Sequence, residues 1–169
     1  MSGQGQTRID TLKTSANEMA GEADCLIRIY DPGDENAVIS LWQECALVVP
    51  WNDPVSDINR KLADSPELFF VADANGYIVG TCMAGYDGHR GWIYYLAVAE
   101  SCRREGIARR LVTHAERVLV ERGCPKLELM VRESNADAIK FYERTGFRKE
   151  SVQVLSKRLI EDAPHVYAR

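Results

Sequence analysis

The strongest constraint on the fold is an apolar strand that is soon followed by an amphipathic helix. Residues 92–98 (WIYYLAV) are almost entirely apolar, which is typical of a strand buried on both faces of its sheet. Apolar side chains then recur at helical spacing over residues 107–118, and this pattern stops at Gly123. The two patterns together predict a domain that contains both a sheet and helices packed on it.

Similar patterns predict the other elements. The predicted strands are the segments in which apolar residues alternate or run on, namely residues 25–30, 68–72, 77–86, 92–98, 127–131 and short final strands within 147–160. The predicted helices have apolar residues at helical spacing and cover residues 38–45, 58–62, 107–118 and 138–142. Asp34 and Asp53 are placed to cap the first two helices, and Asn75-Gly76 predicts a hairpin. The chain is therefore predicted to be a mixed α/β (α+β) domain around one twisted sheet.

The domain boundary follows from composition. Residues 1–24 are rich in Ser, Thr, Gly, Gln and Asn and have no sustained apolar period, so they are predicted to be a flexible tail. Residues 25–169 have the size of one domain and contain no linker, so a single domain is expected there.

Charge and cysteine content exclude several classes of protein. The net charge of −4 argues against a surface that binds nucleic acid or an anionic membrane. The five cysteines and three histidines are scattered and form no CxxC pair, so neither a disulfide framework nor a metal site is predicted. The first residues carry no apolar signal-peptide core, and no apolar run is long enough to span a bilayer. A reduced, cytoplasmic protein is expected.

The turn after the apolar strand has the composition of an anion site. It opens into a helix at residues 103–108 (RREGIA), where the first backbone N–H groups have no intrahelical partner and the helix dipole favours negative charge. Gly106 and Ala108 leave room for a pyrophosphate to approach the backbone, and four arginines surround the site. The alternative is a tight turn that needs Gly, with arginines that are only solvated.

The surrounding sequence resembles the GNAT superfamily of N-acetyltransferases, whose pattern is Q/R-x-x-G-x-G/A after the fourth strand, then Asn, Tyr and Gly-Phe. The matching residues, in the same order, are Arg103, Gly106, Ala108, Asn135, Tyr142, Gly146 and Phe147. Residues 131–147 (VRESNADAIKFYERTGF) are similar to ribosomal-protein N-terminal-alanine acetyltransferases, and residues 41–61 resemble the YpeA-type bacterial acetyltransferases. The resemblance implies the acyl-CoA N-acyltransferase fold, a mixed twisted sheet of about seven strands flanked by about four helices.

The resemblance also implies how acetyl-CoA is bound, without a metal ion. The expected contacts to the pantetheine arm and the pyrophosphate come from the backbone of two segments, Leu96, Ala97 and Val98, and Arg103, Arg104, Glu105, Gly106, Ile107, Ala108 and Arg109. Asn135 is expected either to reach the pantetheine or to cap the following helix. Tyr142 is expected to return a proton to the CoA thiolate, the alternative being a tyrosine of the apolar core.

The chain departs from the family pattern at the expected general base. In the ribosomal-protein branch a Glu precedes the Val-Arg of the fifth strand, and here Met130 stands in that place. Glu128 lies two residues earlier and is expected on the same strand face, so it is a substitute candidate for the base. It is equally a candidate for a solvated strand residue. A bound water or capture of a neutral amine from solution would also serve.

Two loops are expected to line the acceptor pocket, because the family places that pocket between them. The candidate substrate-binding residues in these loops are Trp51, Asp53, Tyr86, Asp87 and His89. Asp53 is also a good helix cap, and Asp87-Gly88 is also a good turn. The acceptor is expected to be a primary amine, either a small molecule or a peptide N-terminus, and the protein a monomer or homodimer.

The residues and the resemblance together predict acetyl transfer from acetyl-CoA to a primary amine. In the expected mechanism the amine attacks the thioester directly. A backbone N–H near Val98 stabilises the oxyanion, and Tyr142 protonates the thiolate. Because the thioether of Met130 cannot accept a proton, a catalytically idle module that senses acyl-CoA is the alternative interpretation. A nucleotide-binding fold that uses the same helix start is a third interpretation.

Overall fold

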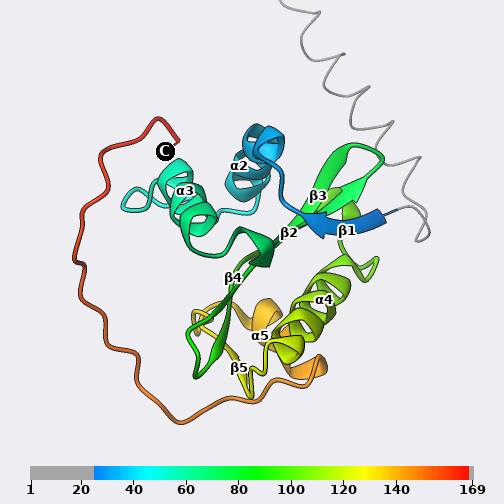
Figure 1. Cartoon of the computed structure of the whole chain (residues 1–169), viewed down its shortest axis with the longest axis vertical. Coiled ribbons are helices and arrows are strands. Elements are labelled where there is room, and N and C mark those ends of the chain that lie inside the picture. Colours follow the sequence, from blue (N-terminus) through cyan, green and yellow to red (C-terminus); the bar gives the residue numbers. More distant parts are fainter. Residues whose placement is uncertain (1–24, 168–169) are drawn as a thin grey trace, which may run out of the picture.

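Five strands form one mixed sheet in the computed structural model, which describes residues 25–167 (Figure 1). In spatial and sequence order these strands are β1 (Cys25–Ile29), β2 (Phe69–Ala74), β3 (Tyr77–Tyr86), β4 (Gly91–Val98) and β5 (Leu127–Leu129). The first four are antiparallel to their neighbours, and β5 is parallel to β4. The predicted α/β class is confirmed. The predicted tail over 1–24 lies outside the described residues.

In the part of the chain that the structure describes, four α-helices cover the two faces of this sheet, which agrees with the predicted number. They are α2 (Glu35–Glu44), α3 (Pro54–Asp64), α4 (Ile107–Glu121) and α5 (Ala136–Arg144). Three short 3-10 helices, η1 (Pro32–Asp34), η2 (Pro66–Leu68) and η3 (Glu100–Cys102), join the larger elements. In Figure 1, α2 and α3 lie on one side of the sheet and α4 and α5 on the other.

The alternation of side chains along the strands builds a separate apolar core on each face. In β3, Cys82 and Ala84 pack with the buried face of α4, whereas Met83 packs with Trp42 of α2. Because successive strand residues point to opposite faces, one short segment contributes to both cores. Cys82 is fully buried and behaves as a small core residue, and this burial raises the pKa of its thiol to about 12.

The local signals at turns and helix starts are mostly confirmed. Asn75 and Gly76 both have positive φ, at 53° and 87°, which is the geometry that a two-residue hairpin requires. Asp53 caps α3, since its carboxylate accepts the N–H groups of Val55 and Ser56. The predicted cap at Asp34 is wrong, because its carboxylate binds Arg28 and the N–H of Asp31 instead.

The final strands predicted within residues 147–160 are wrong, and seven strands overstate the sheet of the described chain. After α5 the chain runs without regular structure around the domain and ends beside α3 (Figure 1). Its apolar side chains, including Val152, Val154 and Leu155, are exposed. A strand is stable only when its backbone groups are paired, and this segment has no strand beside it.

The far end of this segment is attached to the domain by polar contacts. Asp162 accepts hydrogen bonds from the guanidinium of Arg60 and from the backbone N–H of Asp53 (3.0 Å). Arg158 donates to the side-chain oxygen of Asn52 (3.0 Å). Together these contacts hold the segment against the α2–α3 connection and the first turns of α3. Within residues 25–167, no helix has the length and apolar character needed to cross a membrane.

Candidate active site

The sheet opens between β4 and β5. The two strands pair only at Gly91↔Leu127, Trp92↔Glu128 and Ile93↔Leu129, so from Tyr94 onward β4 has a strand partner on its β3 side only. Residues 92–98 were predicted to be buried on both faces of the sheet, and this is wrong at Tyr94, whose side chain is 43% exposed. From Tyr94 onward one side of the β4 backbone therefore has no strand partner, as pairing with a strand-like ligand would require.

The direction of the backbone groups of Leu96, Ala97 and Val98 follows from the register. Ala99 N donates to Val79 O (2.9 Å), which makes Gly80↔Val98 a pair that is not directly hydrogen-bonded. The N–H and C=O of Val98 therefore point away from β3 and into the opening, while those of Ala97 point to β3. Arg103 Nε donates to Val98 O (3.3 Å), so the N–H of Val98 is the group offered to a ligand.

Helix α4 begins beside the end of β4 through a tight turn. Residues 103–106 form the turn and Gly106 is the N-cap, with φ of 81°, so α4 begins at Ile107, where the apolar period predicted it, and not at Arg103. Arg104 also has positive φ, at 70°. No side chain among the described residues caps the helix, and no described atom lies within 4 Å of where a Gly106 Cβ would stand. The first N–H groups of α4 are thus open to an anion.

The arginines around this turn have different roles. Arg103 bridges to the end of β4, as described above, and Arg104 and Arg109 are exposed to solvent at the helix start. Arg110 instead points to the neighbouring edge of the sheet, where it donates to the carbonyl oxygen of Cys25. Glu105 and Ala108 are partly buried, and Ile107 packs in the core beneath α4. The positive charge at the turn therefore comes from Arg103, Arg104 and Arg109.

Tyr142 and Asn135 both lie on or next to α5. Tyr142 packs edge-on against Phe141 (5.1 Å between ring centroids) and Phe147 (5.4 Å). Burial raises the pKa of its phenol, and the side chain packs against the apolar core on the α4 face, which also contains Cys82 of β3. Asn135 Oδ1 accepts from Ala138 N (3.2 Å), which confirms the capping alternative for this residue.

Glu128 lies on β5 directly opposite Trp92, at the closed end of the opening. Its carboxylate pairs with Lys126 (2.7 Å) and with Arg90 (3.8 Å). Met130 follows the strand and is 57% exposed. Glu128 is thus a carboxylate beside the site that is ion-paired with two cations.

A cavity of about 390 Å³ lies on the opposite face of β4, beneath α3. It is lined by Asn52, Asp57, Arg60, Lys61, Asp64, Met83, Ala84, Gly85, Tyr94 and Tyr95. The Tyr95 hydroxyl donates to Asp57 (2.6 Å), and burial raises the pKa of this phenol. Burial also lowers the pKa of Lys61, whose ammonium donates to Ser65 Oγ (2.6 Å) and to the carbonyl oxygen of Ala84.

Sequence reasoning did not select the residues that line this cavity. Asp57, Lys61 and Asp64 are spaced by four and three residues, so they share one face of α3. That polar stripe on α3 is the sequence signal from which these three residues could have been selected. Tyr94 and Tyr95 were considered only as parts of a buried strand, and their exposure to the cavity depends on how α3 crosses the sheet.

None of the five residues predicted to bind substrate lines the cavity beneath α3. Trp51 is 52% exposed on the α2–α3 connection, and Asp53 caps α3. Tyr86 packs on the α4 face, where its hydroxyl donates to Gly123 O (3.3 Å). The N–H groups of Arg90 and His89 bind the Asp87 carboxylate and lower its pKa, so Asp87 organises the β3–β4 turn.

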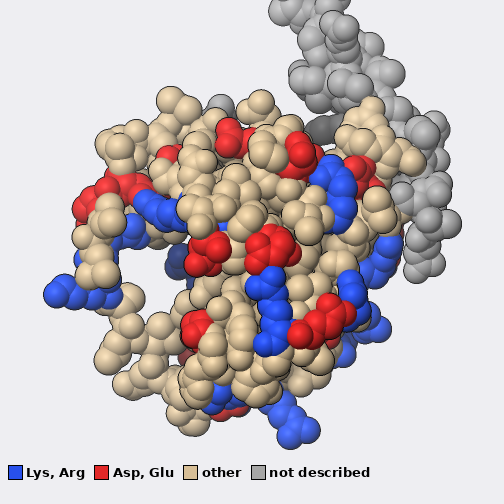
Figure 2. Space-filling model, in the orientation of Figure 1, with Lys and Arg blue, Asp and Glu red and all other residues tan. Residues whose placement is uncertain are grey.

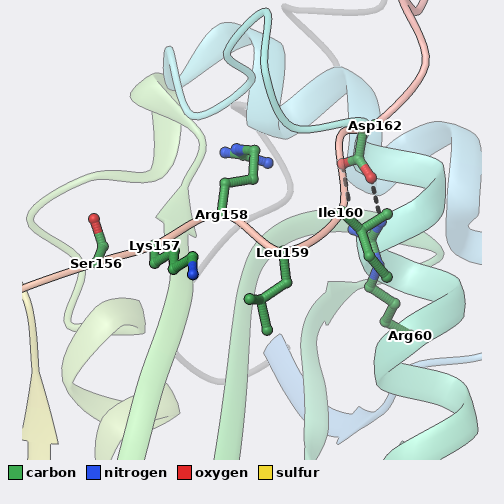
Figure 3. Close-up of a pocket in the computed structure, with 7 residues that line it drawn as sticks. All are labelled: Arg60, Ser156, Lys157, Arg158, Leu159, Ile160 and Asp162. Atoms are coloured by element: carbon green, nitrogen blue, oxygen red, sulfur yellow. Dashed lines mark hydrogen bonds and ion pairs between the residues drawn. The ribbon is translucent and has the colours of Figure 1, made fainter.

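A second cavity, of about 450 Å³, lies between α3 and the C-terminal segment. Figure 3 shows Arg60 and Asp162 pointing toward each other at its edge, with residues 156–160 along the other side. The Arg60 guanidinium lowers the pKa of Asp162 to about 2, so this pair stays ionised under ordinary conditions. Arg60 also lines the cavity beneath α3, and the two spaces are therefore neighbours.

Charged side chains of both signs are interspersed on the side of the molecule seen in Figure 2, in keeping with the net charge of −4. No group of three or more His, Cys, Asp or Glu within residues 25–167 is arranged to hold a metal ion.

Comparison with known proteins identifies a family that this chain matches. The model of the acetyltransferase (GNAT) family matches residues 36–147. An acetyltransferase of Pectobacterium atrosepticum is 52% identical over 136 residues, which cover 80% of this chain and 96% of that protein.

Two solved structures share the fold. An aminoglycoside N-acetyltransferase in complex with CoA superposes with a TM-score of 0.67 at 18% identity, covering 80% of this chain and 95% of its own. The NatC complex bound to Gag peptide and CoA gives 0.66 at 24% identity, covering 76% and 87%. The family match, the identity to the Pectobacterium protein and the shared fold agree with the opened sheet, and the chain belongs to the acetyltransferase (GNAT) family.

Proposed function

We propose that this acetyltransferase moves the acetyl group of acetyl-CoA onto a primary amine, with the donor on one face of β4 and the amine on the other. The observation that carries the proposal is the juxtaposition of the opened β4 backbone with the uncapped start of α4. The first offers hydrogen bonds to an extended arm, and the second offers an anion site where that arm would end.

The residues around the opening suit coenzyme A. Gly106 has open space above it, so a pyrophosphate can approach the first N–H groups of α4. Arg103, Arg104 and Arg109 add positive charge, and the N–H of Val98 offers a donor to the thioester carbonyl oxygen. The aminoglycoside N-acetyltransferase and NatC structures both hold CoA, which supports this assignment.

Tyr142 is the proposed acid. Acetyl-CoA supplies the acetyl group as a thioester, and an N–C bond to the amine forms as the C–S bond breaks. Burial raises the pKa of the Tyr142 phenol, which therefore keeps its proton throughout the physiological pH range. Tyr142 packs against the apolar core on the α4 face of the sheet, which also contains Cys82 of β3, and we assign it the protonation of the departing thiolate.

The amine is proposed to enter through the cavity beneath α3. Asp57 and Asp64 lie in its wall together with two tyrosines and two cations, Arg60 and Lys61, so the wall offers carboxylate and aromatic partners for an amine while its formal charges balance. Glu128 remains the proposed base, as an ion-paired carboxylate at the closed end of the opening. Peptide N-termini and aminoglycosides are the first acceptors to test, because the NatC structure holds a peptide and the other neighbour is an aminoglycoside enzyme.

A turnover screen tests the proposal. Release of the CoA thiol is measured with acetyl-CoA and four classes of amine, namely amino acids, polyamines, aminoglycosides and N-terminal peptides. The expected result is amine-dependent thiol release with one class clearly preferred, and mass spectrometry should place the acetyl group on nitrogen. Tight binding of acetyl-CoA in calorimetry with no turnover on any amine would instead support an acyl-CoA sensor.

A further inference from the structure

The opening of the sheet begins at an irregularity in β4. Met83 of β3 lies opposite Tyr94, and Thr81 lies opposite Ala97, so Tyr95 and Leu96 together face the single residue Cys82. This is a β-bulge, in which one strand carries an extra residue. Tyr95 has φ of 49°, in the left-handed region that glycine occupies easily and that costs other residues conformational energy.

The bulge decides which side chains face the donor side. Tyr94 and Tyr95 both line the cavity beneath α3, whereas Leu96 and Val98 pack on the α4 face. In an unbroken strand, successive residues would alternate and Leu96 would face α3. A slip of one residue would also exchange the backbone directions of Ala97 and Val98. The N–H offered to the thioester therefore depends on the bulge staying where it is.

A buried chain of hydrogen bonds holds the bulge. Trp42 Nε1 donates to Thr81 Oγ1 (2.9 Å), and Thr81 Oγ1 donates to the carbonyl oxygen of Tyr95 (2.8 Å). Trp42 and Thr81 are both fully buried, so neither bond is shared with solvent. The carbonyl of a strained residue, which the bulge has removed from the regular ladder, is thus bound by a side chain of the adjacent strand.

The Tyr95 side chain is held as well. Its ring stacks on Trp42, with 4.0 Å between the centroids, and its hydroxyl donates to Asp57. Trp42 therefore contacts the bulge twice, through its ring face and, by way of Thr81, through its N–H. One indole on α2 sets both the side chain and the carbonyl of Tyr95.

We propose that Thr81, oriented by Trp42, is a positioning residue for acetyl transfer, because it holds the β4 bulge and so fixes the direction of the Val98 N–H. Thr81 itself lies on the face away from α4 and acts only through Tyr95. The inference rests on the proposed function, since its main readout is acetyl transfer. A purely structural role would instead make activity follow the stability of the fold.

Three variants separate the two roles. Thr81→Val keeps the shape but removes the hydroxyl, which leaves the Trp42 N–H without a buried partner. Thr81→Ser keeps the hydroxyl. The double variant Trp42→Phe with Thr81→Val removes the N–H that Thr81→Val leaves unpaired, and it also leaves a cavity where the indole was packed, so its bulge lacks the hydrogen bond without a buried unpaired donor. Val38→Ala, in the same core, removes no hydrogen bond of this chain and is the control for a loss of stability.

The assays are kcat and KM for acetyl-CoA turnover on the best amine of the screen, CoA affinity by calorimetry and the thermal midpoint. Thr81→Val should lower kcat by about tenfold or more, since misplacing a reacting geometry by about 1 Å costs up to about 10²-fold. CoA affinity should be retained, because the pyrophosphate site is untouched. Thr81→Ser should retain most of the activity, and Val38→Ala should lower the midpoint but not kcat.

The comparison of Thr81→Val with Val38→Ala is decisive. At a similar loss of thermal midpoint, kcat should fall in Thr81→Val and not in Val38→Ala, which a purely structural role cannot produce. A fall in kcat that follows the midpoint equally in both variants would overturn the inference, as would a kcat in Thr81→Val equal to that of the wild type. If Thr81→Val does not fold, the comparison of the double variant with Val38→Ala carries the same test.

A second readout separates this inference from the proposed function. Amide hydrogen exchange at Ala97, whose N–H points to β3, is followed by NMR and reports on the bulge without any substrate. If the wild type acetylates no amine, the proposed function fails, and exchange alone then decides the inference. Faster exchange at this amide in Thr81→Val and in the double variant, but not in Thr81→Ser, supports the positioning role. Unchanged exchange in both refutes it.

Discussion

Replacing Gly106 with alanine tests the anion site at the start of α4. Gly106 has φ of 81°, and no described atom lies within 4 Å of the position of an added Cβ. Gly106→Ala therefore introduces backbone strain of about 1–2 kcal/mol but no clash. For a chain of this size that strain should lower the thermal midpoint by about 2–8 °C.

The added methyl group would stand where the pyrophosphate is proposed to approach the helix. Losing one charge-assisted hydrogen bond to a backbone N–H costs about 1.5–3 kcal/mol, which corresponds to a rise in Kd of about 10- to 150-fold. Isothermal titration calorimetry with CoA measures that change directly.

The same helix offers a matched control at its other end. Gly123 has φ of 78° and is equally open, with no described atom within 4 Å of its Cβ position. Gly123→Ala should cost the same stability and leave CoA affinity unchanged. Equal losses of affinity in both variants would trace the effect to strain in α4, and unchanged affinity in folded Gly106→Ala would refute the anion site.

Three other substitutions test single residues of the site. Tyr142→Phe should lower kcat by about 10²–10⁴-fold while CoA affinity is retained. The control Tyr77→Phe, on the exposed hairpin, should change neither quantity. If Tyr142→Phe keeps the kcat of the wild type, Tyr142 is a core residue only. Glu128→Gln should lower kcat/KM and shift the acidic limb of its pH profile, and a profile that overlays the wild type would leave water or the neutral amine as the alternative. Asn135→Ala should cost about 1 kcal/mol in urea denaturation, since it removes the cap of α5, and Asn135→Asp should restore it. An accompanying loss of CoA affinity in both variants would show that Asn135 also binds the ligand.

Features set by neighbouring residues were predicted well from sequence. The hairpin at Asn75-Gly76 needs two positive φ angles, and the cap at Asp53 needs only its own helix. The stop of α4 before Gly123 is of the same kind, since Gly123 takes a positive φ at the end of the helix. Such signals involve a few adjacent residues, so the sequence that carries them also contains their partners.

Predictions failed where a partner is distant in sequence. Residues 147–160 have strand-like composition, but a strand needs a paired neighbour, and the described chain provides none there. Asp34 was expected to cap α2, yet Arg28 on β1 binds its carboxylate. In each case the local preference was real and a tertiary contact, or the lack of one, decided the outcome.

For the site, the amino-acid sequence by itself determined which segments form the proposed donor side. Gly106, the arginines around the start of α4 and Tyr142 lie within two short motifs whose order and spacing are typical of the family. The proposed acceptor side was decided by the tertiary structure alone. Asp57 of α3 meets Tyr95 of β4 at a bulge whose carbonyl binds Thr81, which in turn binds Trp42. Residues from four separate elements meet there through packing, and packing leaves no fixed spacing in the sequence.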